Sequence, residues 1–337
     1  MSNIIRMPNL FTFEETETVV KPDFSTTNLF DNRTVPWANI GTNIRGSADV
    51  EDAIYKAKLD WKVIQEDAYS KSGLHLEGYK ANLKEHFPKN ICLGIVKNRY
   101  EVIQNYEALS FMDLLLDEGA VLETAGCSHN YQKVWLEAKL PERMIGGEKM
   151  SVYLIVINSH NGQGSLTVAL TPVRVVCQNM FNLALKRASR TWSCVHSKNM
   201  KSKIENAKKT LFNTEVYMDE LHHETENLKS IILPDDKVEV YIDSLLQLKD
   251  TNPSLIQIKR NEEQKRELKE RYFNAPDLKD MEKSAYRFVN AVSDFVTHTV
   301  PPRKTKHREE NVFFNSTLGG KELKMIDTAY SMMKKIA

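Results

Sequence analysis

The chain has 337 residues, of which 41% are hydrophobic, so it can bury a sizeable core and is expected to be globular instead of disordered. Its 46 basic and 45 acidic residues leave a net charge of +1, which conceals any local asymmetry. The four cysteines form no CxxC pair, which favours free thiols in a reducing compartment. No signal-peptide pattern is present, and no apolar run reaches the ~20 residues that span a bilayer. We expect a soluble, cytoplasmic protein that has no membrane partner.

The N-terminal region, residues 1–90, is predicted to form an arm followed by a small helical segment. Residues 1–35 are polar and show no clear period, which is typical of a loosely attached arm. A helix is predicted over residues 50–57, after a capping aspartate. We expect Trp37 and Trp61 to pack in the core, with base stacking as the alternative.

Residues 91–198 are predicted to form the core of the protein. A buried strand is expected at residues 91–96, and a helix capped by Asn105 is expected to end at Gly119. Alternating apolar and polar residues then predict four strands, at residues 120–126, 132–139, 150–158 and 164–171. Because the connections are short, as in the polar hairpin loop 159–164, these strands are expected to form an antiparallel meander.

The stretch from Gly164 to Arg190 is predicted to begin as a strand and to end as a helix. Thr171 can cap a helix, and Pro172 suits a first helical turn because its missing N–H has no partner there. From residue 173 to about 190, apolar residues then recur at helical spacing. A second stripe, spaced by four, consists of hydrogen-bond donors: Arg174, Gln178, Asn182, Lys186 and Arg190.

Residues 199–337 are predicted to form a helical region. Apolar residues at near-heptad spacing indicate a long helix over residues 200–230, which is a candidate for subunit contacts together with the final helix. Further helices are expected at residues 238–248, 262–273, 281–296 and 321–336. The predicted fold class is therefore α+β, an antiparallel β-meander flanked by helices with a helical C-terminal region.

The sequence offers little that points to an enzyme. It contains no P-loop, no GxGxxG after a strand, no GxSxG elbow and no HExxH. Two Cys-x-His pairs, Cys127–His129 and Cys194–His196, could together supply four zinc ligands, but buried thiols beside surface imidazoles are the preferred interpretation. We therefore expect a non-catalytic protein with no metal and no cofactor. A metal-dependent enzyme is kept as an alternative.

Basic residues concentrate between Lys186 and Lys209, where Glu205 is the one acid. Cationic side chains track a phosphate backbone, and amide side chains satisfy base edges without strict sequence choice. We expect DNA to bind at Arg174, Gln178, Asn182, Lys186, Arg187, Arg190, Lys198, Lys201 and Lys203. The run Arg303–Arg308 is a second basic site, and the loop 159–164 with Lys97-Asn98-Arg99 is the expected opposite wall of a groove. A solvated charged surface is the alternative for both runs.

Short motifs along most of the chain resemble the phage/plasmid-like domain-of-unknown-function proteins, a family of phages, prophages and plasmids. The matching residues are Val35-Pro-Trp37, Ile40-Gly41, Leu59-Asp-Trp61, Tyr100, Gln104-Asn105-Tyr-Glu107, Glu123-Thr-Ala-Gly126, Val134-Trp135, Ser159-His160, Thr171–Asn179, Asn290-Ala-Val292, His298 and Gly319-Gly320. Asn161 and Met180 depart from the pattern, which has Asp and Thr there. The resemblance implies a mobile-element origin and a bacterial host cell, without implying an activity.

Residues 105–190 are also similar, at the level of pattern, to the β-β-β-α core of single-strand annealing recombinases. That resemblance implies an oligomeric ring or filament whose helix after the sheet contacts single-stranded DNA. Lys186, Arg187 and Arg190 are the positions that match the basic residues of that helix.

The sequence therefore predicts a phage or prophage protein that binds single-stranded DNA and promotes strand annealing and recombination as a homo-oligomer. The alternative is a protein-interaction module, such as an inhibitor of a host defence system or a regulator, with a host or phage protein as partner. A continuous positive surface would favour DNA, whereas an exposed apolar patch would favour a protein partner.

Overall fold

The computed structural model describes residues 40–86, 88–117, 119–176, 180–185, 190–199, 202, 213–248, 250–299, 307–318 and 320–336. The expected arm and Trp37 lie outside the described residues. Two antiparallel sheets and a group of C-terminal helices confirm the α+β class and the helical C-terminal region. The division of the chain at residues 90 and 198 stays a prediction.

The larger sheet has six strands in the order β1-β5-β6-β7-β8-β9, and all neighbouring strands are antiparallel. They are β1 (Thr42–Asn43), β5 (Val121–Cys127), β6 (Lys133–Ile145), β7 (Glu148–Ser159), β8 (Leu166–Arg174) and β9 (Thr191–Cys194). The four predicted strands are confirmed as β5 to β8. The segment between the predicted strands 132–139 and 150–158 is mostly strand as well, because a tight turn at Gly146-Gly147, both at positive φ, extends the hairpin.

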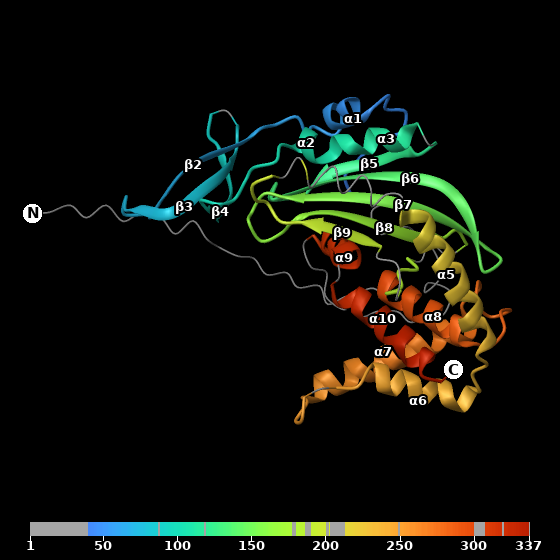
Figure 1. Ribbon diagram of the computed structural model, residues 1–337. Coiled ribbons are helices and arrows are strands. Elements are labelled where there is room, and N and C mark those ends of the chain that lie inside the picture. Colours follow the sequence, from blue (N-terminus) through green and yellow to red (C-terminus); the bar gives the residue numbers. More distant parts are fainter. Residues whose placement is uncertain are drawn as a thin grey trace, which may run out of the picture.

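The two faces of this sheet are covered by different parts of the chain (Figure 1). The helices α1 (Val50–Lys56), α2 (Asn105–Leu109) and α3 (Asp113–Leu116) lie on one side, and the C-terminal helices lie on the other. Side chains alternate accordingly. Leu136 and Leu154 belong to the larger core, whereas Trp135 and Ile155 pack in a second core with Phe313.

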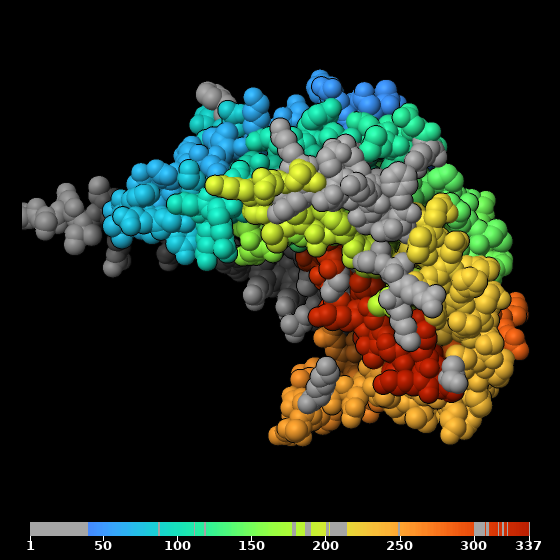
Figure 2. All heavy atoms as spheres, in the orientation of Figure 1, coloured from blue at the N-terminus to red at the C-terminus, as the bar shows by residue number. Residues whose placement is uncertain are grey.

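The smaller sheet has the order β2-β3-β4, from β2 (Val63–Tyr69), β3 (His75–Lys84) and β4 (Ile91–Lys97). Figure 2 shows that it projects from the body of the protein. The strand expected at residues 91–96 is confirmed as β4. The other two strands were missed, because polar residues such as Gln65 and Asn82 occupy the face that packs on the body and obscure the alternation.

The helix expected from residue 173 to about 190 is wrong, because β8 continues through Pro172 to Arg174. Leu170 directs its backbone N–H away from β7, to Arg190 O at 2.8 Å. Two residues further on, the Pro172 nitrogen lies on that same side, beyond Ala169, where pairing with β9 stops. A proline is tolerated there because no hydrogen bond to β7 or β9 is lost. Residues 177–179 and 186–189 lie outside the described residues.

The C-terminal helices surround α8 (Ala285–His298), whose side chains are almost all buried against α5, α7 and α10. The others are α5 (Asn213–Ser230), α6 (Asp235–Leu245), α7 (Leu255–Asn274), α9 (Arg308–Leu318) and α10 (Lys321–Lys334). The helices predicted in this region are confirmed, the first of them over its described residues 213–230. Helix α9 was not predicted, and it packs Phe313 and Phe314 against the large sheet.

Candidate functional site

The two sheets meet at a group of buried polar side chains, Asn82, Asn105, Asn158, His160 and His196, which we call the polar junction. Asn105 and His196 lie on the segments that follow β4 and β9, and Asn158 and His160 lie where β7 ends. Local structure places Asn105 inward. Gln104, not Asn105 as predicted, is the N-cap of α2, and its backbone N–H donates to Glu107 at 3.0 Å.

Hydrogen bonds determine the tautomer of His160. Asn105 donates its amide to Leu59 O at 2.7 Å, so its Oδ1, 2.9 Å from His160 Nε2, acts as an acceptor. His160 Nε2 therefore carries the proton, and Nδ1 is left as an acceptor. The Asn82 amide donates to His160 O at 2.7 Å, which ties the small sheet to the large one.

Hydrogen bonding also determines the tautomer of His196. Its Nδ1 lies 3.2 Å from Glu101 O and donates to it, so Nε2 is left as an acceptor. Its ring stacks on Tyr100 at a centroid distance of 4.6 Å, and the Tyr100 hydroxyl donates to Ser159 O at 2.8 Å. The stack joins the chain after β4 to the chain after β9.

Four buried atoms of this region have no hydrogen-bond partner among the described residues: Trp61 Nε1, Asn158 Oδ1, His160 Nδ1 and His196 Nε2. Burial lowers the pKa of His160 to about 3 and that of His196 to about 4, so both rings are neutral at pH 7. Each of these atoms therefore keeps an unused hydrogen-bonding position, Trp61 Nε1 as a donor and the other three as acceptors. Trp61 packs against the core as expected.

A buried carboxyl group lies within the large sheet. Glu137 is fully buried, and Thr124 Oγ1 donates to its Oε2 at 2.7 Å. Burial raises the pKa of Glu137 well above its usual value, and the neighbouring Glu123, which pairs with Arg45 at 2.6 Å, raises it further. Glu137 alternates along β6 with the apolar residues Leu136 and Ala138, which typically puts such a residue on the solvent face of a strand. It is buried because the second core covers that face.

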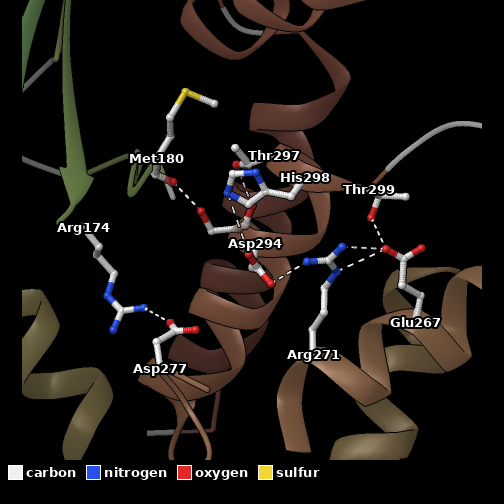
Figure 3. A network of polar contacts seen from close by, with 10 residues as sticks. Arg174, Met180, Glu267, Arg271, Asp277, Asp294, Thr297, His298 and Thr299 are labelled. Carbon is white, nitrogen blue, oxygen red and sulfur yellow. Dashed lines mark hydrogen bonds and ion pairs between the residues drawn. The ribbon is translucent and has the colours of Figure 1, made fainter. Parts of the chain in front are cut away.

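Two residues of the predicted DNA site are buried in structural roles. Arg174 is 1% exposed and forms ion pairs with Glu148 at 2.7 Å and with Asp277 at 2.9 Å, and Figure 3 shows the pair with Asp277. Asn182 is equally buried. Both assignments are corrected, because the helix on which these two residues would have shared an outward face does not form: Arg174 lies on the fully buried strand β8, and Asn182 lies on the chain that follows it.

The remaining predicted residues fall into two groups. Arg190 donates to Leu170 O at 3.3 Å and Thr317 O at 3.4 Å, and burial lowers the pKa of its guanidinium, so it fastens α9 to β8. Lys198 is exposed. The other members lie outside the described residues: Gln178, Lys186, Arg187, Lys201 and Lys203. In the basic run Arg303–Arg308, only His307 is described with its side chain.

The loop 159–164 packs against β4, just before the turn at Lys97-Asn98-Arg99, and its role as one wall of a groove stays a prediction. A Cβ on Gly94 of β4 would be 2.8 Å from the Asn161 backbone, and one on Gly162 would be 2.8 Å from Val96. The two Cys-x-His pairs do not join into one cluster among the described residues, where neither Cys127 nor Cys194 forms a disulfide.

Comparison with known protein families gives a match over residues 92–317, which is more than half of the chain. The matching model is described as a domain of unknown function, DUF932. The chain belongs to the DUF932 family. The match includes Asn105, Asn158, His160 and His196 of the polar junction. No curated protein and no solved structure matches the chain. No helix within the described part of this DUF932 protein is both long and apolar enough to span a membrane.

Proposed function

We propose that this DUF932 protein is a non-catalytic single-stranded DNA-binding protein of phage or prophage origin that promotes strand annealing and recombination as an oligomer. The observation that carries the proposal is the stack of Tyr100 on His196. It holds two basic segments, far apart in the sequence, at one edge of the protein. We call the exposed residues Lys97, Asn98, Arg99, Gln163 and Lys198 the basic edge.

The chemistry of the basic edge suits a single strand. Its three cations can follow phosphates, and Asn98 and Gln163 can satisfy base edges. Tyr79 is 44% exposed and is the register partner of Lys97 across β3 and β4, so an aromatic ring for base stacking lies beside a cation. Lys198 also leads into the lysine-rich sequence 200–209.

Annealing follows from binding if the protein assembles. Several copies that each hold a strand raise the effective concentration of complementary strands without new contacts. In this proposal the protein acts in the cytoplasm of the bacterial host and requires no nucleotide cofactor.

The test measures binding of a labelled oligothymidine over a salt series from about 50 to about 300 mM NaCl. We expect the affinity to fall steeply with salt, and we expect the triple variant Lys97→Ala/Arg99→Ala/Lys198→Ala to reduce the log–log slope by about 2 because it loses three phosphate contacts. Tyr79→Ala should weaken binding without changing the slope. The matched control is Lys56→Ala/Lys269→Ala/Lys283→Ala, which removes the same charge from surface ion pairs elsewhere. Binding that is absent, or insensitive to salt, contradicts the proposal.

An exposed apolar face supports the second candidate, a protein-interaction module such as a host-defence inhibitor. On the outward face of the small sheet, Ile95 is 49% and Tyr79 is 44% exposed. Exposed apolar patches mark protein contacts. The second function replaces the first if two results are obtained together. No oligonucleotide binds, and Ile95→Glu removes proteins that co-purify from the bacterial host. The control variant Val240→Glu, at an exposed position of α6, should not remove them.

A further inference from the structure

A cluster of metal-ligating side chains lies away from the basic edge, where α9 meets the turn between β5 and β6. It consists of His129, His307 and Glu310, and one potential ligand atom from each lies within 4.8 Å of the other two. The residues come from segments almost 180 positions apart in the sequence. The tertiary fold, and no local motif, brings them together.

The His129 side chain already contacts the other two. The His129 and His307 rings stack with a centroid distance of 3.6 Å and an interplanar angle of 10°. Glu310 Oε1 lies 3.0 Å from His129 Nδ1, and its Oε2 accepts the His129 backbone N–H at 3.1 Å. A backbone donor on one carboxylate oxygen is the outer-shell support that orients a ligating carboxylate.

The donor set identifies the class of ion. Two imidazoles with one carboxylate form the three-ligand set of open zinc sites, in which water takes the fourth position. Ligands about 2.0–2.2 Å from a tetrahedral ion lie roughly 3.4 Å apart, so small side-chain movements would close this cluster around one. Imidazole ligands disfavour magnesium and calcium, which take oxygen ligands.

We propose that His129, His307 and Glu310 bind one Zn²⁺-class transition-metal ion, which clamps α9 onto the β5–β6 turn. The cluster involves neither the basic edge nor the polar junction, so this proposal stands independently of DNA binding. One charged neighbour influences the affinity, because Lys133 interacts electrostatically with Glu310. Cys127 lies two residues before His129 and is the alternative ligand that the test must distinguish.

The test is equilibrium binding of Zn²⁺ to the purified full chain by calorimetry, after dialysis against a chelator. We expect one ion per chain and a higher melting temperature with zinc. His129→Ala and Glu310→Gln should each weaken binding more than about tenfold and abolish the shift. His223→Ala, which removes an exposed imidazole from α5, should change neither the affinity for zinc nor the shift in melting temperature. Equal melting temperatures of the chelated variants and wild type show that folding is intact.

A Co²⁺ spectrum provides a readout that folding defects do not mimic. We expect visible d–d bands without the near-ultraviolet thiolate charge-transfer band, and no change in Cys127→Ser. A thiolate band that disappears in Cys127→Ser overturns the assigned ligand set. If wild type binds no zinc, or if binding persists in His129→Ala and Glu310→Gln, the site itself is overturned.

Discussion

Trp135 packs against two adjoining glycines, and this contact shows how single residues shape the large sheet. A Cβ on Gly41 would be 2.5 Å from Trp135 Cζ2, and a Cβ on Gly126 would be 2.9 Å from the Gly41 Cα. On its other side, the Trp135 ring lies 4.8 Å from Phe313 of α9. The two glycines therefore allow β1, β5 and the indole to approach closely.

We predict that Gly41→Ala destabilises the protein much more than Gly46→Ala. Both glycines have left-handed backbone, with φ of 75° and 77°, so both variants lose about 1 kcal/mol to backbone strain. Gly46 has no atom within 4 Å of an added Cβ, whereas Gly41→Ala collides with Trp135 and should lose a further ~1–3 kcal/mol. Urea denaturation measures the difference, and equal losses would show that the indole can move aside.

The buried histidines predict acid sensitivity. Their pKa values, about 3 for His160 and about 4 for His196, lie below the unfolded value of 6.5, so the unfolded chain binds more protons below pH 6.5. The free energy of unfolding should fall as pH decreases from 6.5 to 4, by up to ~1.4 kcal/mol per pH unit for each ring.

Urea denaturation at several pH values measures this slope. His160→Gln/His196→Gln should flatten it, whereas His223→Gln on the surface should not. Glu137 acts in the opposite direction, because a raised carboxyl pKa stabilises the fold at low pH, so the test is the difference between variant and wild-type slopes. Equal slopes would contradict the assigned burial of the two rings.

At the scale of elements, α7 and α8 are joined by a buried charge network (Figure 3). Arg271 and Asp294 are 2% and 1% exposed and lie 2.6 Å apart, and Glu267 accepts from Arg271 at 2.7 Å and from Thr299 at 2.7 Å. Ser293 of α8 donates to Met180 O, which ties the same helix to the chain after β8. Because charges in an apolar interface need partners, this network restricts how the two helices can pack.

We predict that Asp294→Ala lowers the free energy of unfolding by ~3–5 kcal/mol, because Arg271 would retain a buried charge without this partner. The matched control is Asp243→Ala, which breaks a pair with Lys265 in which the aspartate is 65% exposed. The control should lose at most about 1 kcal/mol. Chemical denaturation measures both, and similar losses would indicate that water reaches Arg271.

At the scale of the whole molecule, the chain after β4 and the chain after β9 meet at the junction of the two sheets. The small sheet projects from the body, and the residues after β9 lie against it in Figure 2. An oligomer with this arrangement could present many basic edges to one strand.

We predict that single-stranded DNA shifts the mass of the protein in solution to that of a ring or filament. Light scattering coupled to size-exclusion chromatography, with and without a long oligothymidine, measures the change. The basic-edge triple variant should keep its DNA-free mass and lose the shift. A wild-type mass that rises only by the mass of the bound DNA would mean that the protein binds strands without assembling on them.

Part of the fold could be predicted from local patterns. Strands β5 to β8 and the C-terminal helices other than α9 were predicted, because one buried face imposes a period of two or of 3.6 on the sequence. Locally, Thr171-Pro172 and donors spaced by four suit a helix. Pairing of residues 167–174 with β7 made this segment a strand instead.

Of the candidate sites, the sequence indicated the basic character of Lys198 and the proximity of loop 159–164 to Lys97. It did not indicate the polar junction or the metal cluster. Asn105, His160 and His196, like His129 and His307, are single polar residues in unrelated segments, and no spacing along the chain predicts that they meet.

The sequence by itself determined the α+β class, the antiparallel order of the central strands and the helical C-terminal region, because these follow from patterns within one segment. Only the tertiary structure decided which polar residues are buried and which meet. Arg174 became an internal ion pair instead of a DNA contact, because Asp277 and Glu148 surround it. Whether a side chain is buried or paired depends on which distant segments pack against its face. Local sequence patterns do not identify those segments.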